Sequence, residues 1–228
     1  MNNFQLVNFD TDSITICKPC GEPFSEEEQD KLINALNAEF PKQIKWEPDV
    51  YFPKLVVLRA KNYIMQDEKG KVKIKGSALK SSKAEIACKE FQKAIIQTIL
   101  DEKFDYVNIY NKYIKEACNV TQENIKRWVS KRTFTKKLDT SERANETKQK
   151  DALAGSNYKE GDKFYLIFRE DGTLVLAENF DGSYDKLKMC EKIYKSAQVF
   201  SSVIPVDELF INYKLKKNQK ALEALINE

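Results

Sequence analysis

Two aspartates that stand two positions apart are the residues of this sequence whose type and spacing best suit catalytic chemistry. Asp10 and Asp12 lie between two short runs of alternating apolar residues, which predict a strand, a tight turn and a second strand over residues 4–16. Side chains two apart on a strand point to the same side, and hard divalent cations bind carboxylate oxygens. The sequence therefore predicts a β-hairpin whose acidic tip holds a divalent metal ion.

The residue types that are missing or rare exclude other chemistries. The chain has no histidine, which excludes histidine-based triads, histidine general bases and histidine metal ligands. Its five cysteines include one Cys-x-x-Cys pair, Cys17 and Cys20, which is a weak zinc or redox signal without a second pair. An odd number of cysteines and no signal peptide indicate a reducing compartment, so we expect a cytoplasmic protein. No apolar run is long enough to cross a membrane, and we expect no membrane contact.

The basic residues are clustered, although the formal net charge of the 228 residues is only +3. Residues 61–93 hold nine lysines against four acidic residues, which gives a local charge of +5. Residues 112–137 hold eight basic residues against two acidic ones, which gives +6. Such clusters favour binding to a phosphate backbone, although a solvated lysine face gives the same pattern.

The first part of the sequence predicts an α+β fold, with an antiparallel sheet and a helix packed on it. Ser25 and Glu28 form a capping-box pattern at the start of a helix that Pro41 ends. Apolar runs predict strands over residues 44–46, 50–58, 61–65 and 72–75. Pro53 lies inside the second of these runs, so we expect that strand to be bent, bulged or at an edge there.

After Gly76 the sequence pattern becomes mostly helical. Apolar periodicity predicts helices over residues 83–100, 104–117, 121–129 and 184–197 and from about residue 218 onward. A small β-hairpin is predicted over residues 163–168 and 173–176. Residues 131–151 are polar and predict a loop or a flexible arm. We expect two domains, residues 1–80 and 81–228.

Four features, in order along the chain, resemble the family B DNA polymerases. The Asp-Thr-Asp-Ser segment at residues 10–13 resembles motif C of that family. The carboxylate-containing, aromatic segment 46–54 leads into an apolar strand, like a strand of the family's palm domain. The Lys-Asn-Tyr of residues 61–63 resembles the Lys-x-Tyr motif, and Lys75-Gly76 resembles the Lys-Gly element that precedes the thumb. The resemblance implies that residues 1–80 are the C-terminal part of a palm domain.

The resemblance is looser in the second part of the chain. Gly161-Asp162-Lys163 before a strand, and residues 212–215 near the end, are similar to the thumb of phage-like members of the family. The resemblance thus implies a mostly helical thumb with a small β-hairpin over residues 81–228, in a viral protein located in host cytoplasm. Residues 221–228 show no clamp-binding tail, and use of a sliding clamp stays unassigned.

Several parts of such polymerases have no counterpart in this sequence. The motif A aspartate, the fingers helix and the exonuclease domain precede motif C in the family, whereas Met1 stands nine residues before Asp10. Asn8-Phe9 also replaces the Tyr-Gly that precedes motif C. We therefore expect the C-terminal subunit of a split polymerase, inactive without an N-terminal subunit that carries the exonuclease, motif A and fingers. We expect this chain alone to expose an apolar sheet edge or face.

The resemblance implies template-directed nucleotidyl transfer, with dNTP and primer–template DNA as substrates and two Mg²⁺ ions in a site shared with the partner chain. Asp12 is expected to be the firm metal ligand, Asp10 a second ligand and Glu47 a weaker third candidate. The expected DNA contacts are Lys61, Tyr63, Lys75, Gly76, Lys80, Lys83, Lys126, Arg127, Lys131 and Arg132.

Two other functions remain open from the sequence. The chain could be a non-catalytic DNA-binding subunit in which the aspartate pair is vestigial. It could also be a phosphatase of the haloacid dehalogenase type, in which Asp10 is the nucleophile and Asp12 the acid–base. The sequence lacks the alternating β/α pattern that the phosphatase requires.

Overall fold

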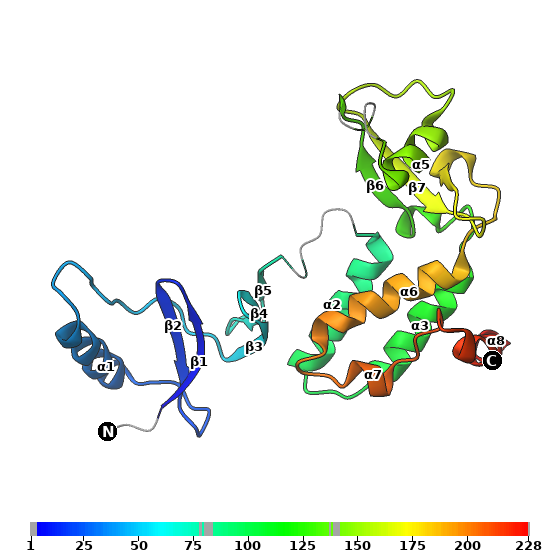
Figure 1. Ribbon diagram of the computed structural model, residues 1–228. Helices are drawn as coiled ribbons and strands as arrows, with labels where there is room; N and C mark the ends of the chain where they lie inside the picture. The colour runs from blue at the N-terminus through cyan, green and yellow to red at the C-terminus, as the bar shows by residue number, and fades with distance from the viewer. Residues whose placement is uncertain (1–3, 78, 80–83, 137, 139–141, 228) are drawn as a thin grey trace. The chain divides into compact units, whose positions relative to one another are not determined.

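The computed structural model describes residues 4–77, 79, 84–136, 138 and 142–227. The chain folds into two compact units, Met1–Gly76 and Ser77–Glu228, which Figure 1 draws as a ribbon. The described helices and the three small antiparallel sheets confirm the predicted α+β class. That the two units are a palm part and a thumb remains an expectation from the resemblance.

The first unit begins with the predicted β-hairpin, followed by the predicted helix. Strands β1 (Gln5–Asp10) and β2 (Ser13–Cys17) pair antiparallel, with a bulge between Leu6 and Asn8. Helix α1 (Glu26–Glu39) starts at a complete capping box, in which the side chains of Ser25 and Glu28 each accept a hydrogen bond from the other residue's backbone N–H. The helix ends at Phe40, immediately before Pro41.

A second, separate sheet follows in the order β3-β4-β5, which differs from the single sheet that the sequence predicts. Its strands are β3 (Lys54–Arg59), β4 (Asn62–Gln66) and β5 (Val72–Lys75), all antiparallel. Strand β3 begins after Pro53, which cannot donate a ladder hydrogen bond, so the prediction of a strand from residue 50 is wrong.

The predicted strand at residues 44–46 is also absent from the structure. The backbone N–H and carbonyl of Trp46 bond to the side-chain amide of Asn37, at 2.7 and 3.0 Å. The Trp46 ring packs on Phe40, with ring centroids 5.4 Å apart. These contacts occupy the groups that a strand would need and fasten the segment to the end of α1 instead.

The first unit has a very small core of its own. Among its described residues, the buried ones lie only within 58–65, and they are Leu58, Asn62, Tyr63, Ile64 and Met65. Helix α1 has no buried residue, and the hairpin strands are at most half-buried. Apolar side chains of this unit are therefore left largely in contact with solvent.

The second unit is built on three helices that lie side by side (Figure 1): α2 (Ile86–Leu100), α3 (Tyr106–Cys118) and α6 (Lys186–Ala197). Fully buried side chains fill the space between them, including Phe91, Ile95, Tyr110, Ile114, Met189 and Ile193. Shorter elements complete the unit: α7 (Val206–Leu209), α8 (Gln219–Asn227), and the 3₁₀ turns η1 (Ile125–Arg127), η2 (Ala177–Asn179), η3 (Gln198–Phe200) and η4 (Lys216–Asn218). The prediction of a helix over 121–129 is wrong, because only η1 forms there.

A three-stranded sheet, β6-β7-β8, belongs to the same unit. Its strands are β6 (Ser130–Thr133), β7 (Lys163–Phe168) and β8 (Leu174–Leu176). Helix α5 (Ala144–Leu153) packs on it and buries Leu153 with Phe164, Leu166 and Leu176. Residues 131–151 therefore contain most of β6 and of α5, and their interpretation as a loop is wrong. No helix among the described residues is both long and apolar enough to span a membrane.

Candidate metal centre and nucleic-acid interface

The turn of the first hairpin presents the two predicted aspartates. Asp10 is the last residue of β1 and pairs with Ser13 across the turn. The backbone N–H of Asp12 and the hydroxyl of Ser13 both donate to the carbonyl of Asp10, at 2.6 and 3.2 Å. Thr11 between them has a φ of +50°, a conformation that β-branched residues rarely adopt. The two carboxylates thus belong to one tight turn, and the backbone of that turn is strained at Thr11.

The two carboxylates have different surroundings. The side chain of Asp10 is 26% exposed, and its Oδ1 lies 3.7 Å from Nζ of Lys61 and 3.3 Å from the Thr11 hydroxyl. Asp12 is exposed, and its carboxylate has no hydrogen-bond or ion-pair partner among the described residues. Asp10 is therefore held by a cation, and Asp12 is free to bind a ligand.

These two side chains are candidate ligands for a divalent metal ion. Carboxylate oxygens suit a hard cation such as Mg²⁺, and the tight turn keeps both on one short segment. Across the described residues, however, no three Asp, Glu, Cys or His side chains come together as a metal-binding cluster. Glu47, the predicted third ligand, is exposed and pairs with Lys45 at 2.6 Å, a bond that lowers the pKa of its carboxyl group. Asp10 and Asp12 therefore suit a divalent ion only if further ligands come from outside the described residues.

The predicted Lys-x-Tyr and Lys-Gly residues meet in the second sheet. Lys61 lies in the turn between β3 and β4, with a φ of +60°, and Tyr63 is buried on β4. Tyr63 pairs with Lys75 across the strands, and Nζ of Lys75 lies 5.8 Å from the centre of the tyrosine ring. The contact between Lys61 and Asp10 links this sheet to the acidic turn of the first hairpin.

Gly76 lies against the same turn, for a reason that the sequence motif does not state. Its φ is +98°, and a β-carbon at this position would collide with the Asn62 side chain and the Lys61 carbonyl. Asn62 is itself buried and donates to the carbonyl of Ala60 at 2.9 Å. Glycine is therefore required sterically, because the end of β5 passes directly over the backbone that carries Lys61.

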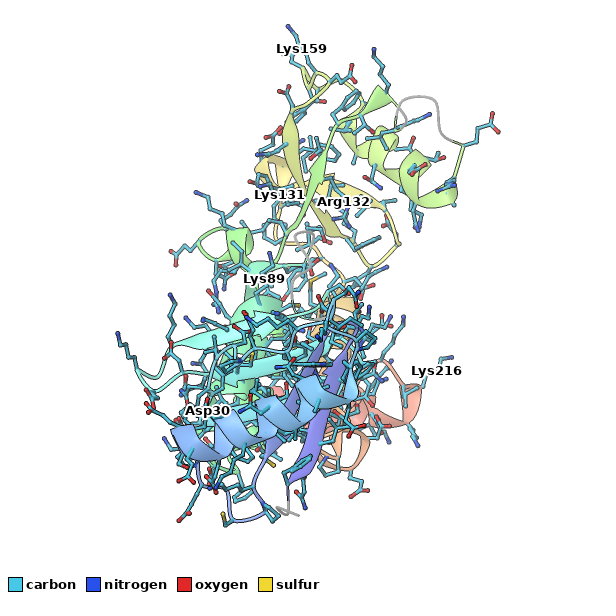
Figure 2. All side chains as sticks on the ribbon, turned by 90° about the vertical axis from the view of Figure 1, so that its left-hand side faces the viewer. Asp30, Lys89, Lys131, Arg132, Lys159 and Lys216 are labelled. Carbon is cyan, nitrogen blue, oxygen red and sulfur yellow. The ribbon has the colours of Figure 1, made fainter. Side chains whose placement is uncertain are left out.

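The basic residues of the second unit fall into two groups. The guanidinium of Arg127 pairs with Glu90 at 2.6 Å and with Glu116 at 2.9 Å, so it joins α2 and α3. Lys126, Lys131 and Arg132 have no acidic partner among the described residues. Figure 2 shows Lys131 and Arg132 on β6. Lys80 and Lys83, also predicted as DNA contacts, lie outside the described residues.

Lys131 and Arg132 do not share one surface. Consecutive strand residues point to opposite faces, and Arg132 is paired with Phe164, whose side chain enters the core under α5. The Arg132 guanidinium donates to the carbonyl of Lys131 at 2.8 Å. Lys131 is paired with Tyr165, on the other face.

A buried polar cluster, which sequence reasoning missed, joins the small sheet to the helices. The carboxylate of Glu85, just before α2, accepts hydrogen bonds from Nζ of Lys192 on α6, at 2.5 Å, and from the hydroxyl of Ser130 on β6. Burial opposes ionisation of Glu85, but the charge and hydrogen bond of Lys192 hold the pKa of the carboxyl group below its usual value. No local sequence signal brings these residues together, because Glu85 and Lys192 are 107 positions apart.

No protein-family model matches this chain, and no curated protein matches it in sequence. Its fold is similar to the solved structure of the family B DNA polymerase from the hyperthermophilic archaeon Pyrobaculum calidifontis, with a TM-score of 0.66 and 17% sequence identity. The similarity covers 88% of this chain and 27% of that polymerase. The chain thus spans about a quarter of the length of that polymerase and is similar to it in fold.

Proposed function

We propose that this chain is the C-terminal palm part and the thumb of a DNA polymerase, and that it acts in template-directed nucleotidyl transfer together with a separate chain. The observation that carries the proposal is the acidic turn of Asp10 and Asp12, held against Lys61 in a fold similar to part of a family B polymerase. A metal-binding turn beside a lysine suits a reaction that joins a triphosphate to the end of a nucleic-acid strand.

In this proposal Asp12 is the principal metal ligand and Asp10 the second. Bound Mg²⁺ would supply charge stabilisation for the triphosphate and the attacking hydroxyl. Lys61 contacts Asp10 in the free chain and is placed to contact a phosphate of the primer strand. Lys75 and Tyr63 support the turn that carries Lys61, and Gly76 lets the end of β5 approach it.

Two features of the first unit support the proposal of a second chain. The acidic turn lacks a third ligand among the described residues, and a two-metal site needs more. The hairpin also has an apolar face that the described residues leave open, since Leu6 and Phe9 are 63% and 64% exposed. These two residues pair with Ile16 and Ile14, so one face of the hairpin is wholly apolar. A partner that covers this face would complete both the core and the metal site.

The test is Mg²⁺-dependent primer extension by this chain together with the chain that co-purifies with it from its native host. Asp12→Ala should reduce extension by about a thousandfold, because the metal stabilises the transition state by several kcal/mol. Asp30→Ala is the matched control, since Asp30 is an exposed carboxylate of α1 (Figure 2) and its loss should leave the rate unchanged. Full activity of Asp12→Ala would refute the catalytic role.

A second candidate function is a DNA-binding subunit with no catalytic role. It is favoured by the contact between Lys61 and Asp10, which neutralises one of the two carboxylates, and by the lack of a third ligand. Under this alternative, Asp12→Ala keeps full extension while Lys131→Gln weakens DNA binding. The phosphatase alternative is disfavoured, because every strand pair in the described sheets is antiparallel.

A further inference from the structure

All the charged residues in the strands of the sheet β6-β7-β8 are basic. Its three strands carry Lys131, Arg132 and Lys163 and contain no acidic residue. None of these three cations has an acidic partner among the described residues. Some cations elsewhere in the unit do have an acidic partner, as Arg169 has in Asp181 at 2.6 Å. An unneutralised sheet of this kind attracts an anionic partner.

One face of this sheet combines two of the cations with an aromatic ring. Tyr165 on β7 is directly opposite Lys131 on β6, and Lys163 stands two positions before Tyr165 on the same strand and face. The Tyr165 side chain is 42% exposed, and Lys163 is exposed. A phenol ring is thus open to solvent, and two lysines stand at neighbouring positions on the same face of the sheet.

The same face is closed at its other end, and much of the opposite face is covered by α5. Ile167, which shares the Tyr165 face, is fully buried. Phe164, Leu166 and Leu176 on the opposite face form a core with residues of α5. The accessible part of the sheet is therefore the end that carries Lys131, Thr133, Lys163 and Tyr165, which we name the Tyr165 face.

We propose that the Tyr165 face binds an unpaired nucleic-acid strand, with a base stacked on Tyr165 and adjacent phosphates held by Lys131 and Lys163. An exposed aromatic ring beside cations is the arrangement that binds single strands, because every base has a face for stacking and every nucleotide has a phosphate. A duplex offers the same phosphates but keeps its bases stacked inside, so it gains nothing from the ring. This proposal rests on the proposed function in one respect only, which is that the bound strand is taken to be DNA.

The test measures the affinity of the full chain for a labelled oligothymidylate and for a labelled duplex of equal length, by fluorescence anisotropy. Tyr165→Ser should weaken oligothymidylate binding about tenfold and leave duplex binding unchanged, whereas Tyr165→Phe should keep both. Lys131→Gln and Lys163→Gln should each weaken binding and lower its salt dependence, by a slope of about 0.7 per lost phosphate contact.

Two control variants separate this face from exposed surface in general. Phe104 is 87% exposed at the turn between α2 and α3, so Phe104→Ser tests whether any exposed ring contributes. Lys216 on η4, which lies apart from Lys131 in Figure 2, provides the control Lys216→Gln. Both should bind oligothymidylate like the wild type. Circular dichroism should show that Tyr165→Ser keeps its fold, because the side chain is partly exposed.

Unchanged oligothymidylate affinity of folded Tyr165→Ser would overturn the proposal, and so would an equal loss of single-strand and duplex affinity. Neither result depends on catalysis, since the binding assay needs no partner chain, dNTP or metal ion. Failure here would leave the polymerase proposal standing, and full primer extension by Asp12→Ala would leave this one standing.

Discussion

At the scale of single residues, Gly76 is as informative as the acidic pair. The sequence motif identifies it only as the glycine of a Lys-Gly pair, whereas the structure shows that its missing side chain lets β5 pass over Lys61 and Asn62. Lys61 in turn contacts Asp10 at 3.7 Å. Gly76 therefore supports the acidic turn indirectly, through Lys61.

We predict that Gly76→Ala destabilises the sheet β3-β4-β5 by about 1–3 kcal/mol more than Gly70→Ala does. Both glycines have a positive φ, +98° and +76°, so both substitutions carry the same kind of backbone cost. Only Gly76 has neighbours within reach of an added β-carbon, since Gly70 faces open space. Native-state hydrogen exchange of the amides of β4 measures the difference, and equal losses would show that the close approach is not rigid.

The individual aspartates were predictable from the sequence, but their surroundings were not. The Asp-x-Asp pattern between two runs of alternating apolar residues predicts a hairpin turn, and the structure has this turn between β1 and β2. The lysine that contacts Asp10 lies 51 positions away, and no local pattern predicts a contact across that separation. Tyr165 is a similar case. The sequence shows only an aromatic residue in a predicted strand, and its pairing with Lys131 is seen only in the structure.

At the scale of elements, strong local signals were reliable and weak ones were not. The capping box of α1 and the alternating runs of β1 and β2 predict those elements almost to the residue. Helix α5 was missed because Leu153 is its only buried residue, so its sequence has almost no apolar stripe. Its helical form depends on packing against β8.

The cluster of Glu85, Ser130 and Lys192 connects α2, β6 and α6. We predict that Lys192→Met destabilises the second unit by about 3 kcal/mol at pH 7. The substitution leaves a buried carboxylate without its cation. Lys195→Met is the control on the same helix, because Lys195 is 65% exposed and its partner Glu191 keeps Lys214. That variant should change the stability by less than about 1 kcal/mol. Urea unfolding followed by the fluorescence of Trp128 measures both.

The pH dependence of the same pair gives a separate prediction. The pKa of Glu85 is lowered in the folded chain, so its ion pair stabilises the fold above the ordinary pKa of 4.5. This contribution is lost as the pH falls through the folded pKa, because the carboxylate must then be protonated. In Lys192→Met the buried carboxyl group favours its neutral form, so the deficit relative to wild type should shrink between pH 7 and pH 4. A deficit that stays constant would place its cause in packing rather than in charge.

At the scale of the whole molecule, the two units differ in how complete they are. The second has many buried aromatic and aliphatic side chains, whereas the buried residues described in the first lie within 58–65 only. In the proposed function, the partner chain would cover the apolar face of Leu6, Phe9, Ile14 and Ile16.

We predict that Phe9→Ser changes the unfolding free energy of the chain itself by less than about 0.5 kcal/mol but strongly reduces primer extension by the assembled complex. The side chain is 64% exposed in the free chain, so its removal costs little there. Phe104→Ser, at a ring that is 87% exposed in the second unit, should leave both measurements unchanged. If Phe9→Ser kept full activity in the complex, the partner would not cover this face.

The most direct test of the central claim, that the acidic turn holds a catalytic metal ion, is a change of metal preference at Asp12. Primer extension by the partnered chain would be measured for wild type and Asp12→Cys with Mg²⁺ and with Mn²⁺. A thiolate binds Mg²⁺ poorly and softer ions better, so Asp12→Cys should be almost inactive with Mg²⁺ and recover substantially with Mn²⁺. Equal activity of the variant and the wild type with Mg²⁺ would contradict the account.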